Sequence, residues 1–267
     1  MSFDLYLRGD NLPLNAILEH LGKYPDFQRQ ELPDSSYALV NPATSVYCYF
    51  RMDEQESLGF SLNYNRPTFF ALETMPVVEN LCRQFQLTVE DPQEDFTGPV
   101  SLPELINSWR IHNERAVKAL KAQGVALNYF PESKANEWWA YTRVREKMAA
   151  DLGDSVFVPE VFILKRPAEE PFRMIVWPEG NRQILPPSDV VWIERSEDDR
   201  GLVSGARFFE MVFPYTSEYR IDTEAYRLLD PVWHTEVISL TRTLELMPVT
   251  SQYEQIAPDG FHDVVLD

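Results

Sequence analysis

The sequence predicts an α+β fold: an N-terminal ferredoxin-like βαββαβ unit, a helical connector, and C-terminal antiparallel β-hairpins with flanking helices. Three observations carry this prediction. Several short segments alternate apolar and polar residues, which is typical of half-buried strands. Other segments repeat apolar residues with helical spacing. Finally, 44% of the 267 residues are apolar or aromatic, which is enough to build a sizeable core.

The first 95 residues follow the order of a split βαβ sandwich. Phe3, Leu5 and Leu7 alternate with polar residues and predict the first strand. Asn11 is a candidate N-cap for the first helix, and Thr74 for the second. The remaining expected elements are a helix over 12–21, strands over 37–40, 46–51 and 58–64, a helix over 75–85, and a closing strand over 87–90.

Residues 91–100 are the best candidate for a linker. They hold two prolines, one glycine and three acidic residues within ten positions. We therefore expect two domains, an α+β sandwich domain over 1–95 and a helical connector plus mixed α+β domain over 101–267.

Two capped helices are expected to form the connector. Ser101 and Glu104 match the capping-box pattern at the start of the first, and Gly124 is a plausible stop. The second helix follows Ser133 and ends before Gly153.

The remainder of the chain is predicted to be rich in strands. Two antiparallel hairpins are indicated by strand-like segments on either side of acidic turns. A helix is then expected after Asp230 and Pro231, because apolar residues recur with helical spacing as far as Met247. The expected hairpins pair 156–165 with 172–177 and 190–194 with 202–213, and a last strand is expected over 263–266.

The charge of the chain excludes several classes of partner. Its 42 acids and 24 bases give a net charge of −18 at pH 7, which disfavours direct binding to nucleic acid or to an anionic membrane. No apolar run approaches the roughly 20 residues of a membrane span. Residues 101–150 alone are basic, with 8 bases and 5 acids. We interpret them as a connector whose bases pair with acidic neighbours; the alternative is a separate binding surface.

The chain start and the two cysteines indicate a cytoplasmic protein. The first residues include Asp4 and lack the cationic and apolar regions of a secretory signal. Cys48 and Cys82 each lie in an apolar pattern, so buried free thiols are expected.

No catalytic or metal-binding motif is present, so we expect no cofactor and no metal. The four histidines are not paired at ligand spacing, and no glycine-rich phosphate loop occurs. Glu137, beside Trp138 and Trp139, is the one carboxylate worth testing for hydrolase chemistry; a core-facing Trp with a solvated Glu is the preferred interpretation. His262 and Asp263 could form half of a base–orienter pair, but a terminal loop is simpler.

Clusters of acidic residues in predicted turns are the remaining candidates for function. They could serve solubility alone, or they could meet the lysines and arginines of a basic partner. The candidate partner-binding residues are Glu197, Asp198 and Asp199 first, and Asp53, Glu54 and Glu56 second.

Over most of its length the chain resembles small acidic α+β immunity proteins of bacteria, in particular those that neutralise nuclease effectors of type VI secretion systems. The segments that carry the resemblance are Met1–Leu7, Phe60–Pro67 and Ile184–Val191, and none is a diagnostic motif. The resemblance implies a cytoplasmic protein that blocks a cognate toxin with a basic cleft by stoichiometric binding, and it brings no catalytic residues. The alternative is an enzyme of unrecognised family, a carboxylate-based hydrolase with a site between the two halves.

Overall fold

The computed structural model describes residues 1–10, 12–32, 36–52, 57–167, 169–231, 235–248 and 252–266. Within them the fold is α+β, as predicted, with six α-helices and mainly antiparallel sheets. The chain divides into two compact units. Unit 1 comprises Met1–Ala135 and Ala257–Asp267, and unit 2 comprises Asn136–Ile256. Unit 2 is thus inserted into the sequence of unit 1, and the boundary expected at 91–100 falls inside unit 1.

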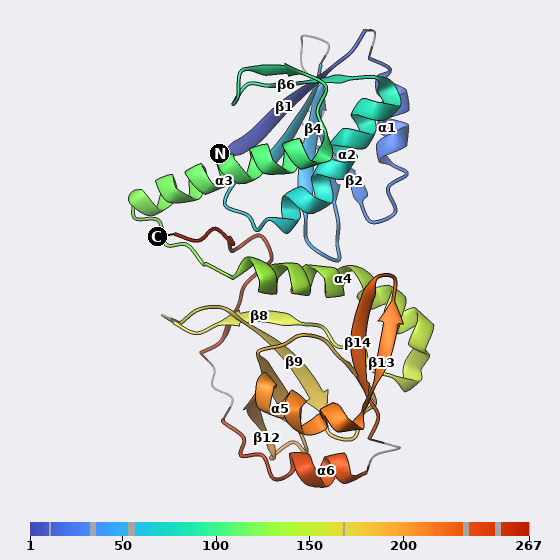
Figure 1. Ribbon diagram of the computed structural model, residues 1–267, viewed down its shortest axis with the longest axis vertical. Helices are drawn as coiled ribbons and strands as arrows, with labels where there is room; N and C mark the ends of the chain where they lie inside the picture. The colour runs from blue at the N-terminus through green and yellow to red at the C-terminus, as the bar shows by residue number, and fades with distance from the viewer. Residues whose placement is uncertain are drawn as a thin grey trace. The chain divides into compact units, whose positions relative to one another are not determined.

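The core of unit 1 is one face of a seven-stranded antiparallel sheet (Figure 1). Its strands alternate as the sequence predicts: Phe3, Leu5 and Leu7 are fully buried, whereas Asp4 and Tyr6 point to the other face. The strand order is β2-β3-β4-β5-β1-β6-β7. Their bounds are β1 Ser2–Arg8, β2 Gln28–Glu31, β3 Ser36–Val40, β4 Tyr47–Met52, β5 Leu58–Asn63, β6 Thr88–Asp91 and β7 Phe96–Gly98.

Helices α1 (Leu14–Leu21), α2 (Phe69–Phe85) and α3 (Leu102–Ala122) cover that buried face. The capping box expected at Ser101 and Glu104 is present at the start of α3. Helix α2 begins earlier than expected. Its N-cap is Thr68, and Thr74 lies inside the helix, where its hydroxyl donates to the Phe70 carbonyl at 2.7 Å. The apolar residues that precede Thr74 are buried on the same helix, and Pro76 lies inside α2. The predicted helix start at Thr74 is therefore wrong.

Residues 91–100 form a hairpin with the preceding strand. Val89 lies opposite Gly98, and Asp91 lies opposite Phe96, so β7 extends the sheet of unit 1. The acidic and turn-forming residues in this stretch serve a tight reversal between two paired strands.

The segment 257–266 returns to unit 1 without forming the expected strand. It is held by backbone hydrogen bonds, from Phe130 N–H to the His262 carbonyl at 2.8 Å and from His262 N–H to the Asn128 carbonyl at 2.9 Å. Only an isolated bridge between Tyr129 and His262 is recorded there, which confirms an irregular terminal segment.

Unit 2 is built on two small sheets and helices α4 (Glu132–Leu152), α5 (Gly205–Val212) and α6 (Glu236–Thr241). The larger sheet has the order β12-β11-β9-β8-β15, with β9 and β11 parallel and its other pairs antiparallel. The smaller has the order β10-β14-β13. The bounds are β8 Phe162–Lys165, β9 Phe172–Pro178, β10 Gln183–Leu185, β11 Val190–Glu194, β12 Arg200–Ser204, β13 Thr216–Ile221, β14 Glu224–Leu229 and β15 Glu254–Gln255.

Both expected hairpins of this region form, but each has one strand that is shorter than predicted. In the first hairpin, the strand expected over 156–165 begins only at Phe162. The strand expected over 202–213 ends at Ser204, and α5 begins at Gly205. Phe208 and Val212 are buried one helical turn apart, so the apolar run has a helical period and the predicted strand is wrong beyond Ser204. Helix α6 is likewise shorter than expected and stops at Thr241.

The cysteines largely follow expectation, and the basic middle follows it in part. Cys48 is a buried free thiol, and Cys82 is a half-buried one; burial raises the pKa of Cys82 to about 11. In the basic middle, one of the following three ion pairs reaches the acidic part that follows it, as the connector interpretation expects, and the other two join bases to acids of the middle itself. These ion pairs are Arg110 with Glu132, Lys118 with Glu114, and Lys147 with Asp222.

Candidate functional site

The acidic tip at 197–199 is carried by the hairpin of β11 and β12. The turn is closed by its own backbone, because the N–H groups of Arg195 and Ser196 donate to the Asp199 carbonyl at 3.0 and 3.2 Å. The Asp199 N–H in turn donates to the Ser196 hydroxyl at 3.1 Å. The conformation of the tip is therefore fixed locally.

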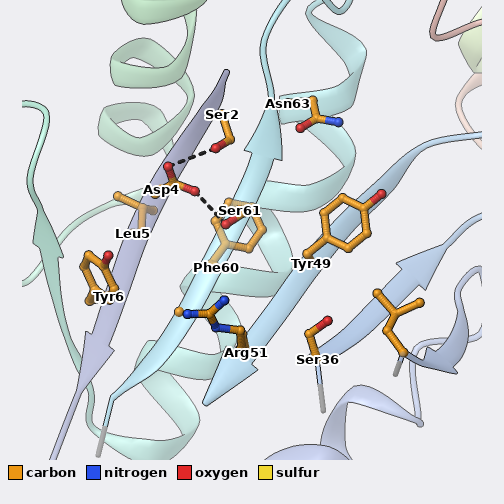
Figure 2. Close-up of a pocket in the computed structure, with 12 residues that line it drawn as sticks. Ser2, Asp4, Leu5, Tyr6, Ser36, Tyr49, Arg51, Phe60, Ser61 and Asn63 are labelled. Atoms are coloured by element: carbon orange, nitrogen blue, oxygen red, sulfur yellow. Dashed lines mark hydrogen bonds between the residues drawn. The ribbon is translucent and has the colours of Figure 1, made fainter. Parts of the chain in front are cut away.

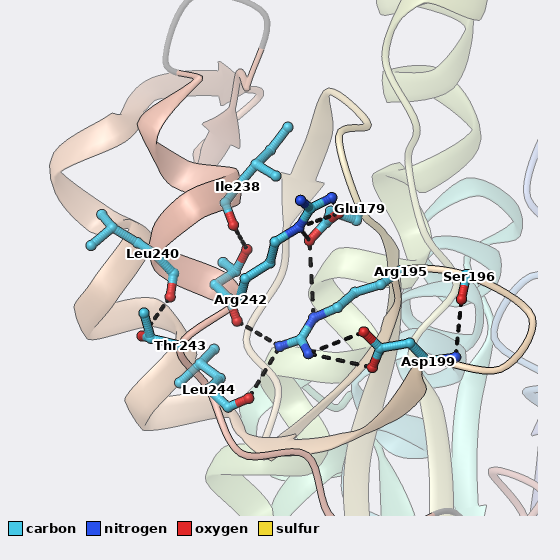
Figure 3. Close-up of polar contacts among 10 residues, drawn as sticks. Glu179, Arg195, Ser196, Asp199, Ile238, Leu240, Arg242, Thr243 and Leu244 are labelled. Carbon is cyan, nitrogen blue, oxygen red and sulfur yellow. Dashed lines mark hydrogen bonds and ion pairs between the residues drawn. The ribbon is translucent and has the colours of Figure 1, made fainter.

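Arg195 ties this hairpin to the end of α6 (Figure 3). Its guanidinium donates to the carbonyls of Thr241 at 2.7 Å and Leu244 at 3.1 Å, and its side chain is 11% exposed. The buried carboxylate of Glu179 lies 3.9 Å from the Arg195 Nε and also pairs with Arg242 at 2.7 Å. Carbonyls at the end of a helix have no partner within the helix, so a cation there satisfies them.

The three predicted tip residues have different surroundings. Glu197 and Asp198 are exposed and make no hydrogen bond or ion pair with any residue that the structure describes. The Asp199 carboxylate lies 3.4 and 3.5 Å from the Arg195 Nη1. Asp199 thus helps to hold the turn, whereas Glu197 and Asp198 present their charges to the solvent.

The second predicted set falls on a part of the chain without a structural description. Asp53, Glu54 and Glu56 lie outside the described residues. Their candidacy remains the prediction made from the sequence.

Glu137 is an ion-pair partner of a buried arginine. Its carboxylate lies 2.6 Å from the Arg173 Nη1, and the Arg173 side chain is only 6% exposed. The Arg173 Nε lies 3.4 Å from Asp189. Trp138 is buried and donates its indole N–H to the Val161 carbonyl at 2.8 Å. The interpretation of a core-facing Trp beside a solvent-accessible Glu is confirmed, and Glu137 has in addition a structural ion pair.

The sequence patterns did not predict that Arg173 is a buried ion-pair partner. The available signal was a single arginine in the otherwise apolar run of β9. A charge in such a run is expected to be buried with partners.

Asp263 acts on the start of α2. Its buried carboxylate accepts the Thr68 backbone N–H at 2.6 Å, which places a negative charge at a helix N-terminus. Burial raises the pKa of Asp263 to about 6 and lowers the pKa of His262. A cavity of about 270 Å³ lies beside Asp263 and is bordered by the ion pair of Arg110 and Glu132. A structural cap explains Asp263 without a catalytic partner.

The uncovered face of the unit 1 sheet carries a polar groove of about 540 Å³ (Figure 2). At its centre the Asp4 carboxylate accepts hydroxyl hydrogen bonds from Ser2 at 2.9 Å and Ser61 at 2.6 Å. Tyr49 and Arg51 also line it. Polar residues are what an antiparallel sheet places on a solvated face, so this groove needs no ligand to explain it.

The face of the five-stranded sheet in unit 2 that no described helix covers has the opposite character. It holds a groove of about 400 Å³, called here the apolar groove. Its main lining residues are Phe162, Leu164, Met174, Val176, Trp192 and Leu202.

The described residues form neither a metal site nor a membrane-spanning helix. Within the described ranges, no three side chains of His, Cys, Asp or Glu gather closely enough to hold a metal ion. No described helix combines the length and apolar character needed to cross a membrane.

Comparison of the chain with models of protein families, with curated proteins and with solved structures finds no match.

Proposed function

We propose that this chain is a binding protein that engages a basic protein partner through Glu197 and Asp198. More specifically, we propose a cytoplasmic immunity protein that blocks a cognate nuclease toxin by stoichiometric binding. The observation that carries the proposal is the fixed presentation of two unpaired carboxylates at the end of an anchored hairpin.

The anchoring matters because binding costs conformational entropy. A turn already closed by its own hydrogen bonds loses little freedom when a partner arrives. Charges that have no partner among the described residues also lose no existing ion pair to those residues on binding. The tip around Glu197 is therefore well suited to an electrostatic contact.

The chemistry of a nuclease cleft fits these charges. Such a cleft binds phosphates with lysines and arginines, and carboxylates can occupy the same positions. The net charge of −18 would speed the encounter with a basic surface and disfavour direct contact with nucleic acid.

For the fold, we propose that β1, α1, β4, β5, α2 and β6 form a ferredoxin-like unit. The antiparallel order β4-β5-β1-β6 supports it, since a split βαβ sandwich has this connectivity. Strands β2 and β3 would then extend one edge, and β7 the other.

Growth rescue tests the function. Each reading frame adjacent to this one in its native genome is expressed alone in a bacterial host and then together with the wild-type chain. We expect one product to stop growth, the chain to restore it, and the two proteins to co-elute in a fixed ratio. If no adjacent product is toxic, or if the chain restores no growth, the immunity function is wrong.

Charge variants then test the tip. Glu197→Gln with Asp198→Asn should weaken toxin binding at least tenfold and leave stability within about 0.5 kcal/mol. The matched control is Glu160→Gln with Glu210→Gln, which removes the same charge from exposed positions of unit 2. If both double variants weaken toxin binding equally, Glu197 and Asp198 act only through the net charge of the chain and do not contact the toxin.

A further inference from the structure

Strand β9 is apolar on both faces, although the described helices cover only one. Ile175 and Trp177 are fully buried, and the Trp177 ring packs against Phe208 of α5 at 5.3 Å between centroids. Met174 and Val176 point to the opposite face, into the apolar groove. A sheet with one solvated face normally places polar residues there, as unit 1 does.

The apolar character continues across neighbouring strands. On β8, Phe162 lies opposite Met174, and on β11, Trp192 lies beside Val176. On β12, Leu202 lies opposite Trp192. Phe162 and Trp192 remain partly exposed. Leu164, Met174 and Leu202 are at most 8% exposed and form a small buried cluster, so the accessible part of these main lining residues consists of Phe162, Val176 and Trp192. Apolar side chains that stay accessible beside such a cluster are typical of a site that another molecule covers.

Trp192 has an unsatisfied donor. Its indole N–H is buried and has no acceptor among the residues that the structure describes. A buried donor without an acceptor costs free energy. Because this N–H is closed off from the solvent, the groove offers apolar surface but no hydrogen bond from Trp192.

The apolar groove and the acidic tip share the same two strands. Trp192 precedes the tip on β11, Leu202 follows it on β12, and Glu197 and Asp198 lie between them. Glu194 alternates with Trp192 and so points to the same face of the sheet, and Arg200, which lies opposite Glu194 on β12, points to that face as well. These two charges offset one another, so the net negative charge at this end of the groove comes from Glu197 and Asp198. It fits a positively charged occupant and disfavours an anionic one.

We propose that the apolar groove takes an apolar side chain from a basic segment of the protein partner. The side chain would pack against Trp192 and Val176, while flanking lysines or arginines meet Glu197 and Asp198. This inference rests on the proposed function, because it names the second half of the same contact surface. Apolar anchors in such a pocket carry most of the affinity, and the charges mainly set the association rate.

A synthetic peptide tests the groove without the toxin. The probe is a lysine–leucine peptide whose leucines fall on one helical face, and its control has the same composition in scrambled order. Binding of both to the full chain is measured by fluorescence anisotropy. We expect the amphipathic peptide to bind at least tenfold more tightly, because only it can insert apolar side chains while its lysines meet the tip.

Val176→Asp should abolish that preference, since it places a charge inside the groove. Its matched control, Asn63→Asp, adds the same charge to the polar groove of unit 1 and should leave the preference intact. If Val176→Asp does not fold, Phe162→Gln makes the equivalent test from β8. Equal binding of the two peptides, or a preference that survives the groove variant, would overturn the inference.

Sedimentation of the wild-type chain examines the other occupant. A dimer that Val176→Asp converts to a monomer would mean that a second copy covers the groove, and the inference would be wrong. Failure of growth rescue, in contrast, would refute the immunity function and leave the peptide result standing.

Discussion

Buried charges in this chain hold together segments that are far apart in sequence. Arg195 joins a hairpin to the carbonyls after α6, and Asp263 joins the terminal segment to the start of α2. A buried ionic group is costly unless its partners are placed accurately. Each of these residues therefore fixes the position of one segment against another within its unit.

Replacing Arg195 with Met should destabilise the chain by about 3 kcal/mol. The change removes hydrogen bonds to two carbonyls and leaves the Glu179 carboxylate with fewer partners. Urea unfolding measures the loss. Arg200→Met, an exposed change on the same hairpin, should stay within about 0.5 kcal/mol. Equal losses in the two variants would remove the anchoring role of Arg195.

Asp263 should make the chain less stable as the pH rises from about 4 to 6. Its folded pKa of about 6 lies above the ordinary value of 3.8, so the folded state keeps the proton that the unfolded state releases. Below about pH 4 the carboxyl is protonated in both states and does not lower the free energy of unfolding. As the pH rises to about 6, the free energy of unfolding falls, because the unfolded state ionises first. Asp263→Asn keeps an acceptor for Thr68 but cannot titrate.

The measurement for Asp263 is the free energy of unfolding from pH 4 to 7 in both proteins. The wild-type chain should lose up to about 3 kcal/mol relative to Asp263→Asn over this range, from 1.36 kcal/mol per pKa unit. Parallel curves would show that Asp263 titrates normally.

At the scale of elements, the passage from β12 to α5 depends on one glycine. A Cβ atom at Gly205 would lie 2.3 Å from the Ser188 carbonyl oxygen, which is closer than real contacts allow. The Gly205 N–H also donates to the Asp189 carbonyl at 2.8 Å. The strand can therefore turn into a helix here only if the residue has no side chain.

Gly205→Ala should destabilise the chain by about 2 kcal/mol or more, because backbone must move to accept the methyl group. Gly22→Ala is the matched control. Its Cβ would meet only carbonyls at 3.6 Å, and its φ of −70° suits alanine, so stability should stay within about 1 kcal/mol. Thermal unfolding of both variants measures the effect. A melting temperature of Gly205→Ala equal to that of the wild type would contradict the prediction.

At the scale of the whole molecule, a charge of −18 should govern the rate of partner binding. The Debye length, over which charges interact before salt screens them, shortens from about 30 Å at 0.01 M salt to about 8 Å at 0.15 M. The association rate with the toxin identified by growth rescue should fall at least tenfold over this range. The dissociation rate, set by close apolar contacts, should change little. Stopped-flow mixing measures both, and an association rate independent of salt would exclude electrostatic steering.

From the amino-acid sequence one can predict the fold class, the alternation in β1, the capping box of α3 and the exposed acids of the hairpin tip. Each depends on neighbouring residues, through strand alternation, helix caps or turn composition. Three contacts become visible only in the folded structure: Arg195 with the Thr241 and Leu244 carbonyls, Glu137 with Arg173, and segment 257–266 with unit 1. These contacts unite residues distant in the chain, and local patterns do not specify such pairings. The apolar groove has the same origin: an apolar strand indicates burial, but only packing decides which face the helices cover.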